Sequence, residues 1–403
     1  MSNTFVIVGA GHSAGQAVAA LRQADFAGRV ILIGEEPHVP YQRPPLSKAF
    51  LAGTMPLEHI YLRPAKFYRD SEVELLLGKR AEAIVADERC VILSGGKTVR
   101  YDKLLLTTGS RPRRLDLPGV NLPGVCYLRT IADAVRIRDL MKAASKMVVV
   151  GGGYIGLEVA AVASQAGVRV TVLEAAERVL GRVTAPEMSD FFAQLHREHG
   201  VEIQCNVRIT GFEGVNKINA VVCENGEFEV DIVVIGIGIS PNVALAQSAG
   251  LECDNGIVVD EYGGTTDEAI FAAGDCTNHP NSLLQRRLRL ESVHNAVAQG
   301  RHAARNMCGL REPYAEIPWF WSDQYDLKLQ VVGISDGYDQ LVQRRSTEAR
   351  SFTLLYLREG ILIAADVVNN PREYMACKKL VPRQLRVSPA RLADTRIRLQ
   401  DMA

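Results

Sequence analysis

The sequence predicts an α/β fold with two Rossmann-like dinucleotide-binding domains and an α+β domain at the C-terminal end. The first observation is the stretch VIVGAGHSAGQAVA at 6–19, where a β-branched strand runs into a glycine turn and then a helix. The second is VVVGGGYIGLEVA at 148–160, which repeats the same pattern in the middle of the chain. The third is the length of 403 residues, which leaves room for two or three domains with a sizeable core.

The first strand–turn–helix unit has a residue of the required type at each position of the pattern. Gly9 makes the tight turn, Gly11 lets a pyrophosphate approach the backbone, and Ala14 is small enough for close helix–strand packing. Free N–H groups at the start of the helix can donate hydrogen bonds to a negatively charged phosphate. Glu35 follows the second strand at 29–34, where a carboxylate can bind the hydroxyls of a ribose. A glycine turn that binds nothing is the alternative for this unit.

The second unit repeats these features with three glycines, Gly151, Gly153 and Gly156. Its second strand, VRVTVLE, ends on Glu174, about twenty residues after the turn. A carboxylate there suits a free 2′-hydroxyl and repels a 2′-phosphate, so NADH is expected in preference to NADPH. Arg178 and Arg182 would weaken that preference unless they are solvated loop charges, which is the interpretation that we favour.

Composition and charge argue against several classes of partner. The formal net charge is zero, with 46 Lys and Arg against 46 Asp and Glu, so nothing global favours nucleic acid or a membrane surface. The sequence has no apolar run of about twenty residues, so a membrane helix is not expected. The eight cysteines are scattered without a C-x-x-C pair, so neither a metal site nor a redox dithiol is expected. We expect a cytoplasmic protein with free thiols.

Three further stretches resemble motifs of the two-dinucleotide-domain flavoproteins with a glutathione-reductase-like fold. DEAIFAAGDCTN at 267–278 ends on Gly274-Asp275, which alone would indicate only a turn, but which resembles their second FAD motif. LLLTTGSRPR at 104–113, with Thr108 and Gly109, resembles their crossover between domains, and VVIGIGISPN at 233–242 resembles the return. The implied domains are 1–110 (FAD, first part), 111–237 (NAD), 238–317 (FAD, second part) and 318–403 (C-terminal interface).

Four more stretches are similar to the FAD-dependent ferredoxin reductases of bacterial oxygenase systems, and the resemblance covers essentially the entire chain. They are YQRPPLSKAFLAG at 41–53, YLRT at 127–130, ESVHNAVAQG at 291–300 and PWFWSDQY at 318–325. The resemblance implies an FAD site at Gly9, Gly11, Ser13, Ala14, Glu35, Arg43, Lys48, Ala81, Thr108, Gly109, Arg129, Asp275, Val293 and Trp321. It implies an NADH site at Gly151, Gly153, Ile155, Gly156, Glu158 and Glu174.

Lys48 and Glu158 are implied as a catalytic pair at the contact between nicotinamide and flavin. Taken alone, Lys48 would be a surface charge and Glu158 a favourable charge near a helix start. Arg129 can offer a bidentate fork to a pyrophosphate. A helix that starts near Val293 would direct its positive end at the flavin. Ala14 departs from the commoner third glycine, a change that small-residue packing tolerates.

The segment RPPLSK at 43–48 lacks the sulfur that thiol-relay relatives carry beside the flavin. Electrons would therefore leave the flavin directly for an external carrier, which the resemblance implies is an iron–sulfur ferredoxin. Docking is expected near Arg286, Arg287 and Arg289 and on the basic C-terminal domain, with solvated loop charges as the alternative. The functional alternatives are a rubredoxin reductase, an NADH oxidase of the same fold, and a redox-sensing flavoprotein.

Overall fold

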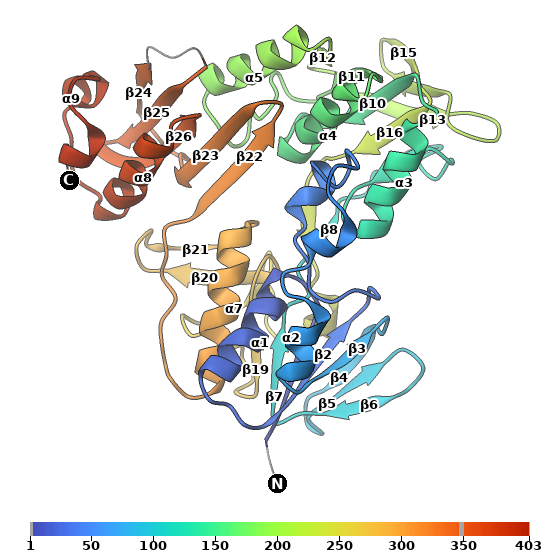
Figure 1. The fold of residues 1–403 in the computed structure, drawn as a ribbon, viewed down its shortest axis with the longest axis vertical. Coiled ribbons are helices and arrows are strands. Elements are labelled where there is room, and N and C mark those ends of the chain that lie inside the picture. The colour runs from blue at the N-terminus through green and yellow to red at the C-terminus, as the bar shows by residue number, and fades with distance from the viewer. Residues whose placement is uncertain (1–2, 346–349, 403) are drawn as a thin grey trace. The chain divides into compact units, whose positions relative to one another are not determined.

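The computed structural model in Figure 1 describes residues 3–345 and 350–402. The chain divides into two units, each assembled from separate stretches. Unit 1 contains the residues up to Gln42, Leu57–Arg111 and Ser240–Pro318, and unit 2 contains Arg43–Pro56, Pro112–Ile239 and the residues from Trp319 onward. The chain leaves unit 1 within β8 (Ser110–Pro112) and returns to it within β17 (Ile239–Pro241).

Unit 1 is built on a five-stranded sheet with the order β19-β7-β1-β2-β3, and all its neighbouring strands are parallel. Its strands are β1 (Thr4–Val8), β2 (Arg29–Gly34), β3 (Val73–Leu77), β7 (Lys103–Leu106) and β19 (Ile270–Ala272). Smaller sheets comprise β4 (Ala81–Val85), β5 (Cys90–Leu93) and β6 (Thr98–Arg100), and β18 (Ile257–Val258), β20 (Thr277–Asn281) and β21 (Arg286–Leu288). Its helices are α1 (His12–Gln23), η2 (Leu57–Ile60), α2 (Ala65–Asp70), α6 (Ala244–Ser248) and α7 (Val293–Met307).

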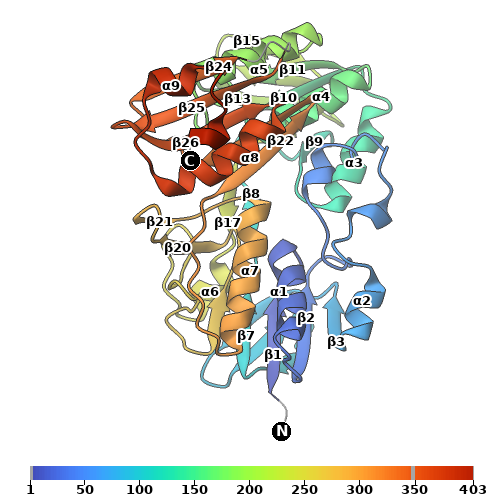
Figure 2. The ribbon, with the colours of Figure 1, turned by 60° about the vertical axis from the view of Figure 1, so that its left-hand side comes forward.

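The two faces of this sheet are buried by different elements. Phe5 and Ile7 point to the face that α1 and α7 cover, while Val6 and Val8 point to the opposite face with Ile257. This alternation follows from the two-residue period of a β-strand. The helices α1 and α7 lie side by side in both ribbon views, although they are far apart in the sequence (Figures 1 and 2).

Unit 2 repeats the architecture with a parallel sheet of order β12-β11-β10-β16-β9. Its strands are β9 (Val125–Tyr127), β10 (Lys146–Val150), β11 (Arg169–Leu173), β12 (Glu202–Gln204) and β16 (Ile232–Ile235), with a second sheet of β13 (Ile209–Glu213), β14 (Ala220–Cys223) and β15 (Gly226–Glu229). Its helices in this part are η1 (Pro44–Ser47), α3 (Ile131–Met141), α4 (Tyr154–Gln165) and α5 (Pro186–Glu198).

The C-terminal part of unit 2 is an antiparallel sheet of order β22-β23-β26-β25-β24. It comprises β22 (Trp319–Gln324), β23 (Leu327–Gly333), β24 (Gln340–Arg345), β25 (Phe352–Arg358) and β26 (Ile361–Val368), followed by α8 (Pro371–Leu380), η3 (Val381–Arg383), α9 (Pro389–Ala393) and η4 (Leu399–Met402). The sheet and its helices give this part its α+β character.

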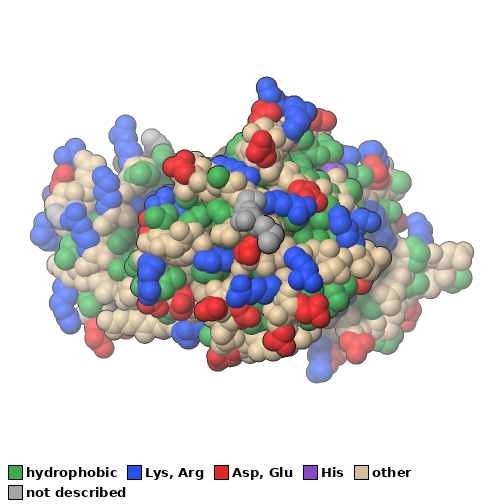
Figure 3. Space-filling model, turned by 90° about the horizontal axis from the view of Figure 1, so that it is seen from below, with side chains coloured by type: hydrophobic (Ala, Val, Ile, Leu, Met, Phe, Trp, Pro, Cys, Tyr) green, Lys and Arg blue, Asp and Glu red, His purple; other side chains and the backbone are tan. Residues whose placement is uncertain are grey.

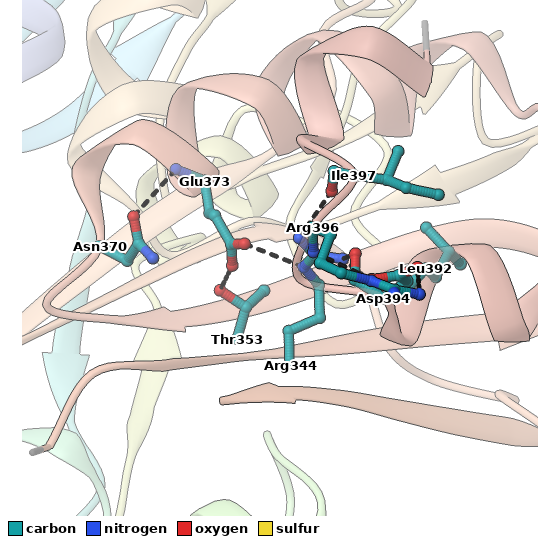
Figure 4. Close-up of polar contacts among 8 residues, drawn as sticks. All are labelled: Arg344, Thr353, Asn370, Glu373, Leu392, Asp394, Arg396 and Ile397. Atoms are coloured by element: carbon teal, nitrogen blue, oxygen red, sulfur yellow. Dashed lines mark hydrogen bonds and ion pairs between the residues drawn. The ribbon is translucent and has the colours of Figure 1, made fainter. Parts of the chain in front are cut away.

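A buried arginine joins the last segment of the chain to this sheet (Figure 4). Arg344 on β24 donates to Glu373 on α8 at 2.9 Å and to the backbone carbonyl oxygens of Asp394 and Ile397, each at 3.0 Å. Glu373 also accepts from Thr353 on β25. Because the guanidinium is 2% exposed, its charge requires these partners, and the contacts hold the chain end against the sheet.

On the face drawn in Figure 3, basic and acidic side chains are interspersed. That distribution agrees with the zero net charge of the chain. Within the described ranges, none of the helices combines the length and the apolar character that crossing a membrane would require.

Candidate functional site: two dinucleotide cradles and a buried ion pair

The two glycine turns have matching backbone geometry. Gly9 has φ of 109° and Gly151 has φ of 102°, and a Cβ at either position would lie less than 3 Å from a backbone oxygen of the neighbouring strand connection. Gly11 and Gly153 are the N-caps of α1 and α4, and a Cβ there would meet nothing within 4 Å. Neither cap has a side-chain hydrogen bond, so no capping side chain occupies the start of either helix.

The third position of the pattern differs between the units. A Cβ at Gly156 would lie 2.1 Å from the carbonyl oxygen of Gly151, so only glycine fits there. Ala14 in the first unit is fully buried and its methyl group is accommodated in the core beneath α1. Ser13, its neighbour, is 6% exposed.

The other predicted flavin motifs of unit 1 gather at the carboxyl edge of its sheet. Thr108 and Gly109 follow β7, and Asp275 follows β19, which are neighbouring parallel strands. Ser110 donates to the Asp275 carboxylate at 2.9 Å, and a Cβ on Gly274 would lie 2.5 Å from the Ser13 hydroxyl oxygen. Strand order therefore brings together segments that are up to about 260 residues apart, as expected where parallel strands end.

The start of α7 lies in the same unit. Ser292 is its N-cap and accepts from the Asn295 N–H at 3.1 Å, so Val293 is the first helical residue, as the sequence predicted. Further along α7, the Gln299 side chain accepts from the Gly274 N–H at 2.7 Å. This contact ties the helix to the turn that carries Asp275.

Glu35 and Ala81 have solvent-accessible side chains in unit 1. Glu35 follows β2, and its side chain is 72% exposed with the Arg80 guanidinium 4.0 Å away. Ala81 is the first residue of β4 and is partly exposed. Both side chains are accessible to a ligand.

In unit 2, Glu174 is held against the glycine turn by backbone donors. Its carboxylate accepts from the Gly152 N–H at 2.6 Å and from the Ala176 N–H at 2.8 Å. The Arg178 guanidinium donates to the carbonyl oxygens of Thr184 and Gly181, so its charge is bound within the loop. Of these two side chains, the Glu174 carboxylate is the one held at the glycine turn.

Lys48 and Glu158 form an ion pair within unit 2. The Lys48 Nζ lies 2.7 Å from Glu158 Oε2, with side chains that are 18% and 2% exposed. Ser47 donates to the same oxygen at 2.6 Å, and Ser322 on β22 donates to Oε1 at 2.6 Å. Burial raises the pKa of Glu158, and Lys48 together with the two hydroxyls opposes that rise.

The remaining predicted residues of unit 2 lie on the same segments as this pair and its partners, or are joined to those segments by a hydrogen bond. The Arg43 guanidinium donates to the Arg129 carbonyl oxygen at 2.5 Å, which joins the segment that carries Lys48 to the loop after β9. Trp321 lies on β22, one residue before Ser322, and is partly exposed. Ile155, in the first turn of α4, is 46% exposed, although its side chain is large and apolar.

The cysteines are all free. Cys90, Cys126, Cys223, Cys276 and Cys377 are buried, and the other three are partly exposed. Burial raises the pKa of Cys276, which lies next to Asp275, so its thiol is held in the protonated and unreactive form.

The arginines of the expected docking region are not equivalent. Arg286 and Arg287 lie on β21 and are exposed, but Arg287 also donates to the carbonyl oxygens of Val259 and Asn278. The Arg289 side chain is 11% exposed and lies 2.6 Å from Glu291. Arg287 and Arg289 therefore hold neighbouring segments of unit 1 together, so a substitution at either would also disturb the fold.

Sequence reasoning missed several polar residues around Glu158. Ser322 and Gln324 alternate on β22 with buried side chains, and His196 is fully buried on α5. Polar residues at inward positions of a strand or helix are uncommon, and that pattern was the available signal.

Comparison with known proteins places these observations in a family. Residues 3–300 match the family model described as "Pyridine nucleotide-disulphide oxidoreductase", and residues 319–403 match "Reductase C-terminal". The chain is 42% identical to putidaredoxin reductase of Pseudomonas putida, with 100% of this chain and 97% of the relative covered. It is 42% identical to rhodocoxin reductase of Rhodococcus erythropolis, with 97% and 92% covered.

A solved structure agrees with the sequence relatives. The putidaredoxin reductase chain in a covalent complex with putidaredoxin superposes with a TM-score of 0.96 at 42% identity, covering 99% of this chain and 98% of that chain. The predicted fold class is thereby confirmed: two dinucleotide-binding domains of the glutathione-reductase type and an α+β C-terminal part. The protein belongs to the pyridine nucleotide-disulphide oxidoreductase family and, within it, to the flavin-dependent ferredoxin reductases similar to putidaredoxin reductase, which use FAD and NAD(H).

Proposed function

We propose that this protein is an NADH-dependent, FAD-containing ferredoxin reductase that supplies electrons to a monooxygenase or a ring-hydroxylating dioxygenase. The balanced reaction converts NADH and two oxidised ferredoxins into NAD⁺, one proton and two reduced ferredoxins. The observation that carries the proposal is the presence of two matched glycine cradles on two parallel sheets, in a chain without a C-x-x-C pair. Two dinucleotides can bind, and no thiol pair is available to store electrons between them.

The residues of unit 1 fit an FAD. The open space at Gly11 and the uncapped start of α1 suit a pyrophosphate, because N–H groups and the helix dipole favour negative charge there. We assign Glu35 to the ribose and Asp275 to the ribityl chain, with Ser13, Ala14, Thr108, Gly109, Ala81 and Val293 as neighbouring contacts. When bound, FAD accepts a hydride from NADH and releases its electrons singly.

The residues of unit 2 fit NADH. The space at Gly153 and the uncapped start of α4 match those of unit 1. We assign Glu174 to the adenosine ribose, where its negative charge disfavours the 2′-phosphate of NADPH. Ile155 offers an exposed apolar surface to the dinucleotide, and the Glu158 carboxylate is assigned to the nicotinamide end.

Lys48 and Glu158 have complementary roles in this proposal. Glu158 holds the Lys48 ammonium at a fixed place, and the ammonium supplies positive charge where negative charge develops as the flavin is reduced. Arg43 supports the same segment through the Arg129 carbonyl oxygen, and we assign the Arg129 guanidinium to the FAD pyrophosphate. Trp321 is proposed to lie near the flavin.

We also propose the domain assignment 1–110, 111–237, 238–317 and 318–403 and a cytoplasmic location. The domain assignment is supported by the glycine cradle in each of the first two parts. A cytoplasmic location is supported by the free cysteines, since thiols persist in a reducing compartment.

The test is NADH-driven reduction of a purified iron–sulfur ferredoxin, with cytochrome c as the final acceptor. We expect cytochrome c reduction that depends on both NADH and the ferredoxin. An equal rate without ferredoxin would contradict the proposal. Two parallel assays test the alternatives. Reduction of rubredoxin would indicate a rubredoxin reductase, and NADH-driven oxygen consumption without any carrier would indicate an NADH oxidase.

A redox-sensing role predicts a different outcome. A sensor would form a long-lived complex with NADH and would turn over slowly with every carrier. Rapid multiple turnovers with ferredoxin would exclude that role.

A further inference from the structure

A hydrogen-bonded chain extends from Glu158 through the C-terminal sheet to α5. Ser322 Oγ donates to Glu158 Oε1 at 2.6 Å, and Gln324 Nε2 donates to Ser322 Oγ at 3.2 Å. His196 Nε2 lies 2.8 Å from Gln324 Oε1, and His196 Nδ1 lies 3.1 Å from the Tyr325 hydroxyl. The chain therefore connects α4, β22 and α5, all within unit 2.

The direction of each hydrogen bond follows from its acceptor. An amide oxygen can only accept, so the His196 Nε2 must carry a proton and donate to Gln324. The other ring nitrogen of a neutral imidazole then accepts, and the Tyr325 hydroxyl is positioned to donate to it. Every donor along the chain is directed toward the Glu158 carboxylate, so the bond dipoles stabilise its negative charge and reinforce one another.

The direction of these hydrogen bonds matters because the side chains that make them are buried. Ser322 and Gln324 are each 1% exposed and His196 is fully buried. Burial lowers the pKa of His196 to about 4, so the ring is neutral at physiological pH, as the directed chain requires. An unpaired buried carboxylate would be costly in this surrounding, and each donor that reaches it reduces that cost.

The groups that face Glu158 come from three elements. Lys48 and Ser47 approach from the η1 segment, and Ser322 approaches from β22. Tyr154 lies on α4 itself; burial raises its pKa, and the charges of Asp366 and Glu158 raise it further, so its hydroxyl stays protonated. Lys48 thus supplies the positive charge at Oε2, while the chain supplies the donors at Oε1.

We propose that Ser322, Gln324 and His196 are positioning residues that keep Glu158 ionised and oriented toward Lys48, so that β22 and α5 control the charge state of the Lys48–Glu158 pair. The chain does not conduct protons, because the Gln324 amide has no proton that it readily passes on. The effect of this hydrogen-bonded chain on flavin reduction by NADH rests on the proposed function. The charge state of Glu158 can be measured whether or not the proposed function is correct.

The experiment is an infrared pH titration of the purified flavoprotein that follows the C=O stretch of protonated Glu158. Loss of the band in Glu158→Gln assigns it. Ser322→Ala should raise the pH midpoint of Glu158 protonation by about one unit or more, because a hydrogen bond to a charged acceptor is lost. Gln324→Met should give a smaller rise, since Ser322 still donates, and Ser322→Thr should restore the native midpoint.

Ser189→Ala is the matched control. Ser189 is a fully buried serine on α5 that donates to the Val179 carbonyl oxygen and takes no part in the chain. A midpoint in Ser322→Ala that equals those of the native protein and of Ser189→Ala would overturn the proposal. If Ser322→Ala fails to fold, an unchanged midpoint in Gln324→Met overturns it equally.

Anaerobic flavin reduction by NADH, measured on the same variants, separates this proposal from the proposed function. A shifted midpoint with a native reduction rate supports the chain but removes its role in NADH oxidation. A native pH midpoint of Glu158 with a lower rate of flavin reduction contradicts the role proposed for Ser322, Gln324 and His196, but it does not contradict the proposed function.

Discussion

The buried carboxylate of Glu158 is held by several hydrogen-bond donors in the candidate site. Its two oxygens accept from Ser47, Lys48 and Ser322, and its side chain is 2% exposed. Removing one partner of a buried ion pair leaves the other charge uncompensated, which is costly. Substitutions at this pair should therefore alter the charge of the site more than its shape.

Lys48→Met should lower the rate of flavin reduction by NADH by about tenfold or more, because one electrostatic donor is removed from the reacting region. Loss of the ammonium should also raise the pKa of Glu158 further. Stopped-flow bleaching of the flavin under anaerobic conditions measures the rate. Lys142→Met, which breaks an exposed pair with Asp139, is the control and should keep the native rate. An equal rate in both variants, with full FAD content, would remove Lys48 from the reaction.

Glu174→Gln should narrow the preference for NADH over NADPH by about tenfold, which corresponds to about 1.4 kcal/mol. The neutral amide no longer repels a 2′-phosphate, but it can still accept from the Gly152 N–H. The ratio of kcat/KM for the two cofactors, with a small dye as acceptor, measures the change. Glu177→Gln, at an exposed position in the same loop, should leave the ratio unaltered. If Glu174→Gln also leaves the ratio unaltered, the assignment of Glu174 to the adenosine ribose is wrong.

At the scale of elements, β25 and β26 meet the loop before α5 through a buried carboxyl group. Thr184 and the Tyr356 hydroxyl donate to Asp366 Oδ2 at 2.5 and 2.6 Å, and the Ala185 N–H donates to the Tyr356 oxygen at 3.2 Å. Burial raises the pKa of Asp366 to about 6, despite these two donors. The folded state therefore holds this proton more tightly than the unfolded chain does.

The sign of the pH dependence follows from that rise. Between about pH 4 and pH 6 the folded state binds more protons, so the contribution of Asp366 to stability falls as pH increases and is lost above pH 6. A shift of about two units corresponds to about 3 kcal/mol. Asp366→Asn should thus be more stable than the native protein at pH 8, by about 1–3 kcal/mol, and should lose that advantage below pH 4.

Urea unfolding of both proteins at a series of pH values, with FAD held at a fixed excess, measures this difference. Asp139→Asn changes an exposed carboxylate in the same unit and is the control. A native protein that is more stable than Asp366→Asn at pH 8 would show that the ionised carboxylate is stabilising, which would refute the prediction.

The sequence predicted the two glycine units and their acids because that chemistry is local: a strand, a turn and a helix within about thirty residues. The chain behind Glu158 was not predictable in the same way. Ser322 and Glu158 are 164 residues apart, and His196 and Gln324 are 128 apart. Their meeting depends on how β22 and α5 pack in unit 2, which no short motif encodes. The grouping of 43–56 with unit 2 depends on the same long-range packing.

For the whole molecule, association with a ferredoxin should depend on charge although the net charge is zero. Opposite charges chiefly raise the rate of encounter, and salt screens them, with a screening length of about 3 Å at 1 M. Ferredoxin reduction should therefore slow with salt, whereas reduction of a small neutral dye should not. Arg286→Glu should lower the ferredoxin rate at low salt, and Arg100→Glu, an exposed arginine on β6, is the matched control. Identical salt profiles for ferredoxin and dye would place docking elsewhere.

In the proposed reaction a single flavin stands between NADH and an iron–sulfur carrier, with no thiol relay. Anaerobic titration with NADH, followed by mixing with oxidised ferredoxin, tests it most directly. One NADH should bleach each FAD, and two oxidised ferredoxins should then restore the oxidised flavin spectrum. Uptake of a second NADH per FAD, or a flavin that stays reduced in the presence of ferredoxin, would contradict it.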